Sequence, residues 1–69
     1  MGILQERLKA CRKQTGLSQE NLAKEIGIVF RSYRRYECGE VDPPFSAIVK
    51  IADYFNVSLD YLAGRTDEP

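Results

Sequence analysis

The sequence contains no histidine and no tryptophan, and its two cysteines, Cys11 and Cys38, are isolated rather than closely paired. A structural zinc site needs four cysteine or histidine ligands at short spacings, so no metal site is predicted. No glycine-rich phosphate loop is present, and no nucleophile has an evident activating partner. These absences predict no catalytic residue, no metal and no cofactor. An enzyme is therefore the least favoured class, and Cys11 is expected to be a small core residue in a reduced chain.

Long apolar runs are also missing. No stretch approaches the roughly 20 apolar residues of a membrane span, and the N-terminus lacks the apolar core of a signal peptide. Glu6 does not fit the myristoylation pattern that a Met-Gly start would suggest. We expect a soluble, unanchored, cytoplasmic protein. At 69 residues there is room for one domain, expected at 1–64 with a frayed tail at 65–69, and hardly for a metabolite cavity.

The formal net charge of zero conceals a division of the chain. Residues 1–36 carry eight basic and three acidic side chains, a net charge of +5, whereas residues 37–69 carry two basic and seven acidic side chains, a net charge of −5. Such asymmetry favours a polyanionic partner at the basic end. Two solvated surfaces without a partner would have the same composition, so charge alone does not decide.

The periodicity of apolar residues predicts an all-α chain of five helices. The first is expected from about Ile3 to Gln14, where Leu4, Leu8 and Cys11 form a stripe that ends before Gly16. The second begins after the N-cap Ser18 and ends at Gly27, and the third covers 29–37. A proline-bearing loop precedes the fourth, whose apolar positions run from Phe45 to Phe55. A short fifth helix lies between Ser58 and Gly64.

The predicted third helix has an aromatic face and a basic face. At 100° per residue Tyr33 and Tyr36 fall on one side, and Arg31, Arg34 and Arg35 gather on the other. One face can pack while the other reaches outward to a nucleic acid groove. A merely solvated arginine face is the alternative.

Several short motifs occur in an order and spacing that resemble one family. They are Leu8-Lys9-Ala10-Cys11-Arg12, Gly16-Leu17-Ser18-Gln19-Glu20-Asn21-Leu22-Ala23, Gly27-Ile28, Tyr36-Glu37-Cys38-Gly39, Ile51-Ala52 and Val57-Ser58-Leu59-Asp60-Tyr61-Leu62. From Leu8 to Gly64 the chain resembles the Cro/C1-type helix-turn-helix regulators of the XRE family. The resemblance implies a compact, lambda-repressor-like five-helix domain that binds double-stranded DNA and regulates transcription, most often as a repressor of bacterial or phage type.

The resemblance also assigns roles to residues. The third helix would enter the major groove, with Arg31 as the best candidate for reading guanine. Phe30 would contact a thymine methyl or remain a side chain at the edge of the core. Ser32, Arg34 and Arg35 would share base and phosphate contacts, and Gln19 would contact a phosphate at the start of the second helix.

Arg12 and Glu37 resemble a pair that ties the first helix to the end of the recognition helix. Two exposed charges that never meet are the alternative. Relatives bind pseudo-palindromic operators as dimers, so a weak homodimer contact is expected around Leu59 and Tyr61, unless both belong to the monomer core. A second functional class is a protein-binding module, such as an antitoxin or adaptor, which the acidic segment 37–69 would suit.

Three departures from the family pattern concern DNA contacts. Val29 stands where serine or threonine usually caps the recognition helix, and Tyr33 replaces a smaller aliphatic residue, so its hydroxyl must find a partner or reach solvent. The loop from Glu40 to Pro44 is acidic where many relatives carry lysine or arginine. Phosphate contacts from this loop are therefore not expected.

Overall fold

The structure, a computed structural model, describes residues 2–69. Over these residues the chain forms five α-helices and no strand, which confirms the predicted fold class. The helices are α1 (Ile3–Thr15), α2 (Gln19–Ile26), α3 (Phe30–Cys38), α4 (Phe45–Phe55) and α5 (Leu59–Ala63).

Two helices have boundaries that differ by one residue from the expected ones. α1 continues to Thr15, because Gly16 adopts a left-handed conformation at φ 75° and the helix needs no earlier stop. α3 begins at Phe30 and ends at Cys38 rather than covering 29–37. Val29 is its N-cap in non-helical backbone (φ −58°, ψ 134°), so the whole element lies one position later.

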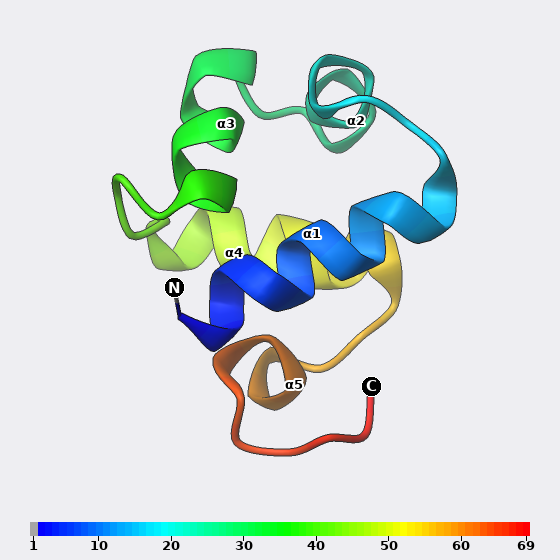
Figure 1. The fold of residues 1–69 in the computed structure, drawn as a ribbon, viewed down its shortest axis with the longest axis vertical. Coiled ribbons are helices and arrows are strands. Elements are labelled where there is room, and N and C mark those ends of the chain that lie inside the picture. The colour runs from blue at the N-terminus through cyan, green and yellow to red at the C-terminus, as the bar shows by residue number, and fades with distance from the viewer. Residues whose placement is uncertain (1) are drawn as a thin grey trace.

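The helices pack around α1, which crosses the middle of the molecule (Figure 1). α2 and α3 lie on one side of α1, and α5 lies on the other; α3 and α5 both contact α1. α4 contacts α2 and α5 and so joins the two ends of the fold. This arrangement leaves the outer face of α3 uncovered by any other helix.

One core receives side chains from all five helices. Its fully buried members are small or aliphatic apart from Tyr33, which is completely enclosed. Burying a leucine or isoleucine side chain contributes about 1.5–3 kcal/mol, so this set holds α3 against the rest of the domain. The buried apolar residues are Leu8, Leu22, Ala23, Tyr33, Tyr36, Ala47, Ile51, Ala52 and Leu62, with Cys11 at the edge.

The segment after α5 makes contacts with α1. Arg7 on α1 donates from Nη1 to the carbonyl oxygens of Tyr61 (2.8 Å) and Thr66 (2.6 Å), and from Nη2 to Asp67 Oδ1 (2.9 Å). Gly64, at φ 83°, lies so close to Ile3 that a Cβ atom there would come within 2.8 Å of the isoleucine side chain. In the part of the chain that is described, no helix is both long and apolar enough to cross a membrane.

Candidate nucleic-acid interface

α2 and α3 form a tight two-helix unit. Gly27 closes α2 at φ 88°, and its N–H and that of Ile28 both donate to the Ala23 carbonyl (2.9 and 3.0 Å). A residue with a Cβ atom would be strained at this φ. Ala23 is 1% exposed between the helices, where a larger side chain would push them apart. The turn thus sets the angle at which α3 is presented.

α3 has two chemically distinct faces. Tyr33, Tyr36 and Glu37 are buried, whereas Phe30 is 41% exposed and the three arginines are exposed. Ser32 is half-buried at the boundary. The exposed face is therefore an arginine surface, composed of Arg31, Arg34 and Arg35.

The arginine surface is barely neutralised by the protein itself. Within residues 2–69, neither Arg31 nor Arg34 has a carboxylate within 4.0 Å, and Arg35 has only Glu40, at 3.8 Å with both side chains about half exposed. A solvent-exposed pair of this kind contributes little. These guanidinium groups are free to meet an anion, and each offers the forked donors that fit a phosphate or the O6/N7 edge of guanine.

The N-terminus of α3 lacks a side-chain cap, as the valine at position 29 predicts. Val29 is 72% exposed and makes no cap hydrogen bond. By contrast, Ser18 Oγ accepts from the Asn21 N–H at the start of α2 (3.1 Å). The first N–H groups of α3 are consequently left to solvent or to an external acceptor.

Arg12 and Glu37 lie together and connect α1 to the end of α3. Arg12 Nε donates to Glu37 Oε2 at 2.9 Å, and Arg12 Nη2 donates to Oε1 at 3.0 Å. A third donor of Arg12, Nη1, binds the Leu17 carbonyl at 3.1 Å. Glu37 is 1% exposed, so the pair is a partly buried, bidentate contact that fixes α3 in position.

Gln19 joins the same cluster. Its Nε2 donates to Glu37 Oε1 at 3.1 Å, so the side chain expected at a phosphate is directed inward to a carboxylate. Gln19 is half-buried at the first position of α2. The start of α2 is thereby linked to the end of α3 through one carboxylate.

The ionisation of this cluster follows from its contacts. Burial by itself would raise the pKa of Glu37, but the hydrogen bond and charge of Arg12, helped by the Tyr33 hydroxyl and by Gln19, outweigh it and hold that pKa below its usual range. The hydrogen bond to Glu37 raises the pKa of Arg12. Burial, with the neighbouring Glu37 carboxylate, strongly raises the pKa of the Tyr33 hydroxyl. Glu37 is therefore ionised and Tyr33 neutral around neutral pH.

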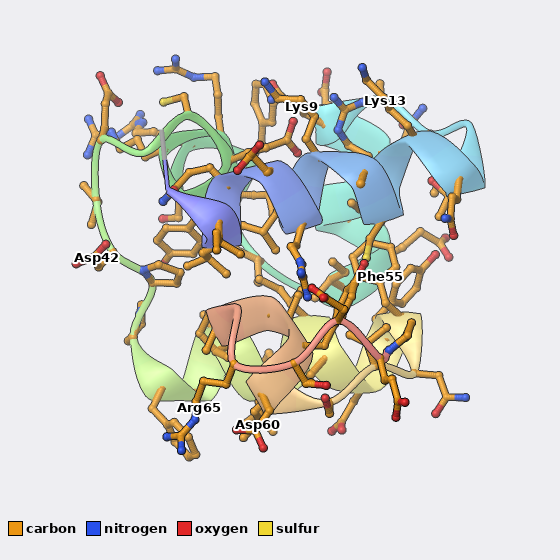
Figure 2. The ribbon with its side chains drawn as sticks, turned by 60° about the horizontal axis from the view of Figure 1, so that its bottom comes forward. Lys9, Lys13, Asp42, Phe55, Asp60 and Arg65 are labelled. Atoms are coloured by element: carbon orange, nitrogen blue, oxygen red, sulfur yellow. The ribbon has the colours of Figure 1, made fainter. Side chains whose placement is uncertain are left out.

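Charge is distributed unevenly around the domain. Lys9 and Lys13 of α1 project from one edge, while Asp60 and Arg65 project from the opposite edge next to α5 (Figure 2). Asp42 lies on the loop between α3 and α4. The division of charge seen in the sequence is thus partly a division in space.

The two residues expected at a dimer contact differ in their surroundings. Leu59 is 38% exposed on α5. Tyr61 is half-buried, and the Arg7 guanidinium lies 4.1 Å from its ring centroid. Sequence reasoning missed this use of Arg7, because nothing local marks a contact between residues more than 50 positions apart.

The described residues form an open hollow that could be tested as a small-ligand site, and no cluster of metal ligands. An open hollow of about 370 Å³ lies between α1 and α5, lined by Ile3, Glu6, Arg7, Ala10 and Tyr61. No group of three cysteine, aspartate or glutamate side chains in residues 2–69 is placed to hold a metal ion. The arginine surface is the feature with evident binding chemistry.

Comparison with known proteins identifies similar chains. The family described as Helix-turn-helix matches residues 8–62. The cryptic phage CTXphi transcriptional repressor RstR of Vibrio cholerae is 46% identical over 67 residues, which cover 94% of this chain and 60% of the repressor. The uncharacterized HTH-type transcriptional regulator YqaE of Bacillus subtilis is 42% identical over 67 residues, covering 96% and 58% respectively. The chain therefore spans about three-fifths of the length of these relatives.

A solved structure has the same arrangement of helices. The P22 c2 repressor protein in complex with a synthetic operator superposes with a TM-score of 0.80 at 26% sequence identity, covering 90% of this chain and 94% of that one.

Proposed function

The chain belongs to the helix-turn-helix family, and from that premise we propose that it is a sequence-specific, double-stranded-DNA-binding transcriptional regulator, acting as a repressor. The observation that carries the proposal is the arginine surface. Three guanidinium groups stand on the uncovered face of α3, the helix that such domains insert in the major groove. The relative RstR is named a repressor, and the P22 c2 repressor was crystallised with an operator. No catalytic role is assigned to any residue.

The contacts divide by their position along α3. Arg31, in the first turn, is placed to donate two parallel hydrogen bonds to guanine O6 and N7. Phe30 precedes it with a partly exposed ring that suits a thymine methyl. Ser32, Arg34 and Arg35 share base and phosphate contacts. Gln19 contacts a phosphate once its amide turns away from Glu37 Oε1, at a helix start where the dipole and unpaired N–H groups also attract an anion.

A single recognition helix reads only a few base pairs, so two copies are needed for a long operator. We expect a homodimer on a pseudo-palindromic site with half-sites about one helical turn apart, in contact through Leu59 and the exposed part of Tyr61. A regulator of this kind acts where the chromosome lies, which in a bacterium is the cytoplasm.

Binding to a labelled duplex at increasing salt tests the proposal. Each phosphate contact should contribute a slope of about −0.9 to the plot of log affinity against log salt, and we expect about four contacts per copy. Arg34→Ala should reduce that slope by about one contact, whereas Arg65→Ala, which removes an exposed cation next to α5, should leave it unchanged. No duplex binding at low salt would contradict the proposal and favour the antitoxin or adaptor class.

A further inference from the structure

Lys9 and Lys13 form a pair of cations one helical turn apart on α1. Lys9 is half-buried and Lys13 is exposed, and no carboxylate of residues 2–69 lies within 4.0 Å of either ammonium group. Glu6, the acidic residue of α1, stands about one turn before Lys9 and lines the hollow next to α5. The positive charge of this lysine pair is therefore open to an external anion.

The position of the lysine pair follows from the contacts that α1 makes with α3. Arg12 donates to Glu37 at 2.9 Å. Gln5 is 8% exposed and packs against the end of α3, where a Cβ atom on Gly39 would lie 3.5 Å from the glutamine Cγ. Arg12 and Gln5 thus mark the line along which α1 meets α3. At 100° per residue, the two lysines lie about 60° and about 100° round α1 from Arg12, both on one side of this line.

The hydrophobic core fills the other side of that line. On α1, Leu8 is buried about 40° round from Arg12 in the opposite sense. On α3, Tyr33 is buried about 40° round from Glu37, whereas Arg34 is exposed about 60° round in the other direction. Because Leu8 and Tyr33 belong to one core, the outer flanks of the two helices face the same way. The lysine pair therefore continues the arginine surface across the contact between α3 and α1.

Figure 2 shows the resulting arrangement. Lys9 and Lys13 project from the edge of the molecule on which α2 and α3 lie, and Asp60 and Arg65 project from the opposite edge. A duplex held by α3 would have the lysine pair beside its groove and Arg65 turned away from it.

We propose that α1 is a second DNA-contacting helix, in which Lys9 and Lys13 bind phosphates of the backbone that borders the groove occupied by α3. This inference rests on the proposed function and extends its contact surface to a helix outside the helix-turn-helix unit. An ammonium group is a compact charge on a flexible stem, so it suits a phosphate better than the paired acceptors of a base edge. Phosphates are the same in every sequence, so the lysine pair adds affinity without adding sequence preference.

Lys9→Gln, Lys13→Gln and the double variant test the inference, with a duplex selected from a random pool and a duplex of scrambled sequence as the two ligands. A phosphate contact with a slope of about −0.9 that vanishes near 1 M salt contributes about eightfold at 0.1 M salt, so each substitution should weaken binding to both duplexes by about that factor. The double variant should reduce the salt slope by about 1.8. The ratio of the two affinities should not change, and urea unfolding should show unchanged stability.

Arg65→Gln is the matched control. It removes one exposed cation from the opposite edge of the molecule and should leave the salt slope unchanged. Ethylation of single phosphates locates the contact on the DNA. At one or more phosphates beside the groove, ethylation should weaken binding of the unmodified chain and have no effect on the double variant.

An unchanged salt slope in the double variant would overturn the inference, as would the same pattern of ethylation interference in both proteins. A slope lowered equally by Arg65→Gln would also overturn it, because the effect would then be one of net charge. A change in the ratio of the two affinities would mean that the lysines read bases, which contradicts a phosphate contact. Failure of the unmodified chain to bind either duplex would contradict the proposed function itself, and this arm contains no variant, so the two failures are distinguishable.

Discussion

At the scale of single residues, Glu37 has the greatest influence on the domain, because a carboxylate that is 1% exposed takes donors from two other elements. A buried charge is tolerated only while its partners remain. The contact contributes less to stability than its short distances suggest, since both groups lose hydration when they pair. Its effect is to determine how α3 is held against α1.

Substitution of the pair should reveal strong coupling. Arg12→Met or Glu37→Met alone leaves one partner uncompensated and should cost on the order of 3–5 kcal/mol, whereas the double variant should lose much less than the sum. Urea unfolding of the four proteins measures the coupling energy. The exposed pair Asp60 and Arg65, 3.8 Å apart, is the control and should show coupling near zero. Additive losses at Arg12 and Glu37 would contradict the account.

The lowered pKa of Glu37 predicts how stability depends on pH. A carboxyl group whose pKa is lower in the folded state stabilises the protein above its unfolded pKa of about 4.3, and that stabilisation is lost as pH falls through the folded pKa. The free energy of unfolding should therefore fall more steeply below about pH 5 in the unmodified chain than in Arg12→Met/Glu37→Met. Urea unfolding between about pH 2 and 6 compares the slopes. Equal slopes would exclude Glu37 as a contributor.

At the scale of the helices, the ends are better explained by local chemistry than by packing. α2 and α5 both begin with a serine whose Oγ accepts a backbone N–H, at 3.1 and 2.9 Å. α3 has no such acceptor. α1 and α4 also begin without a side-chain cap, so the recognition helix is one of three helices in residues 2–69 whose N-cap side chain accepts no N–H.

Val29→Ser should stabilise the domain by about 1 kcal/mol, because the hydroxyl can accept an N–H of the first turn of α3 and the valine contributes little to the core at 72% exposure. In a domain of this size that gain corresponds to an increase in Tm of about 4–8 °C. Ser18→Ala should produce a loss of similar size. If thermal unfolding shows that loss but no gain from Val29→Ser, the missing cap is not what limits α3.

The sequence predicts these elements well, since left-handed glycines and capping serines mark most of their ends. α3 lies one residue later than expected. Its N-cap, Val29, has no side-chain acceptor, so the sequence carries no capping signal for the start of this helix. Long-range pairings are harder still. Arg7 could not be assigned to Thr66 and Asp67, nor Gln19 to Glu37, because these contacts depend on how the helices pack.

The burial of Tyr33 was only half predictable. Its place on the apolar side of α3 follows from helical spacing, but whether its hydroxyl reaches solvent depends on the shape of the core around Cys11, Arg12 and Glu37. The roles of Phe30, Ser32 and the three arginines at DNA remain predictions that need a duplex to test them.

At the scale of the whole molecule, α3, which carries the arginine surface, and α5 lie on opposite sides of α1 (Figure 1). A dimer formed through α5 would therefore leave both copies of α3 uncovered. Arg7 stabilises this side by holding Tyr61 and the segment that follows α5. Leu59 remains partly exposed for a second copy.

In sedimentation experiments the free chain should be a monomer. With a duplex that carries two half-sites, two copies of the chain should bind each duplex. The contact is small, so it should become stable only when both copies are held on one DNA. Leu59→Lys should weaken binding of the second copy while leaving the first intact. A monomer under both conditions would contradict the dimer.

The central claim, that the arginine surface of α3 reads DNA sequence, is tested most directly by selecting bound duplexes from a random pool with the unmodified chain and with Arg31→Ala. We predict a pseudo-palindromic preference in the first selection and the loss of preference at one position per half-site in the second, in agreement with a bidentate contact to guanine. A uniformly weaker selection with unchanged preference would make Arg31 a phosphate contact. The absence of any preferred sequence in the unmodified chain would contradict the account.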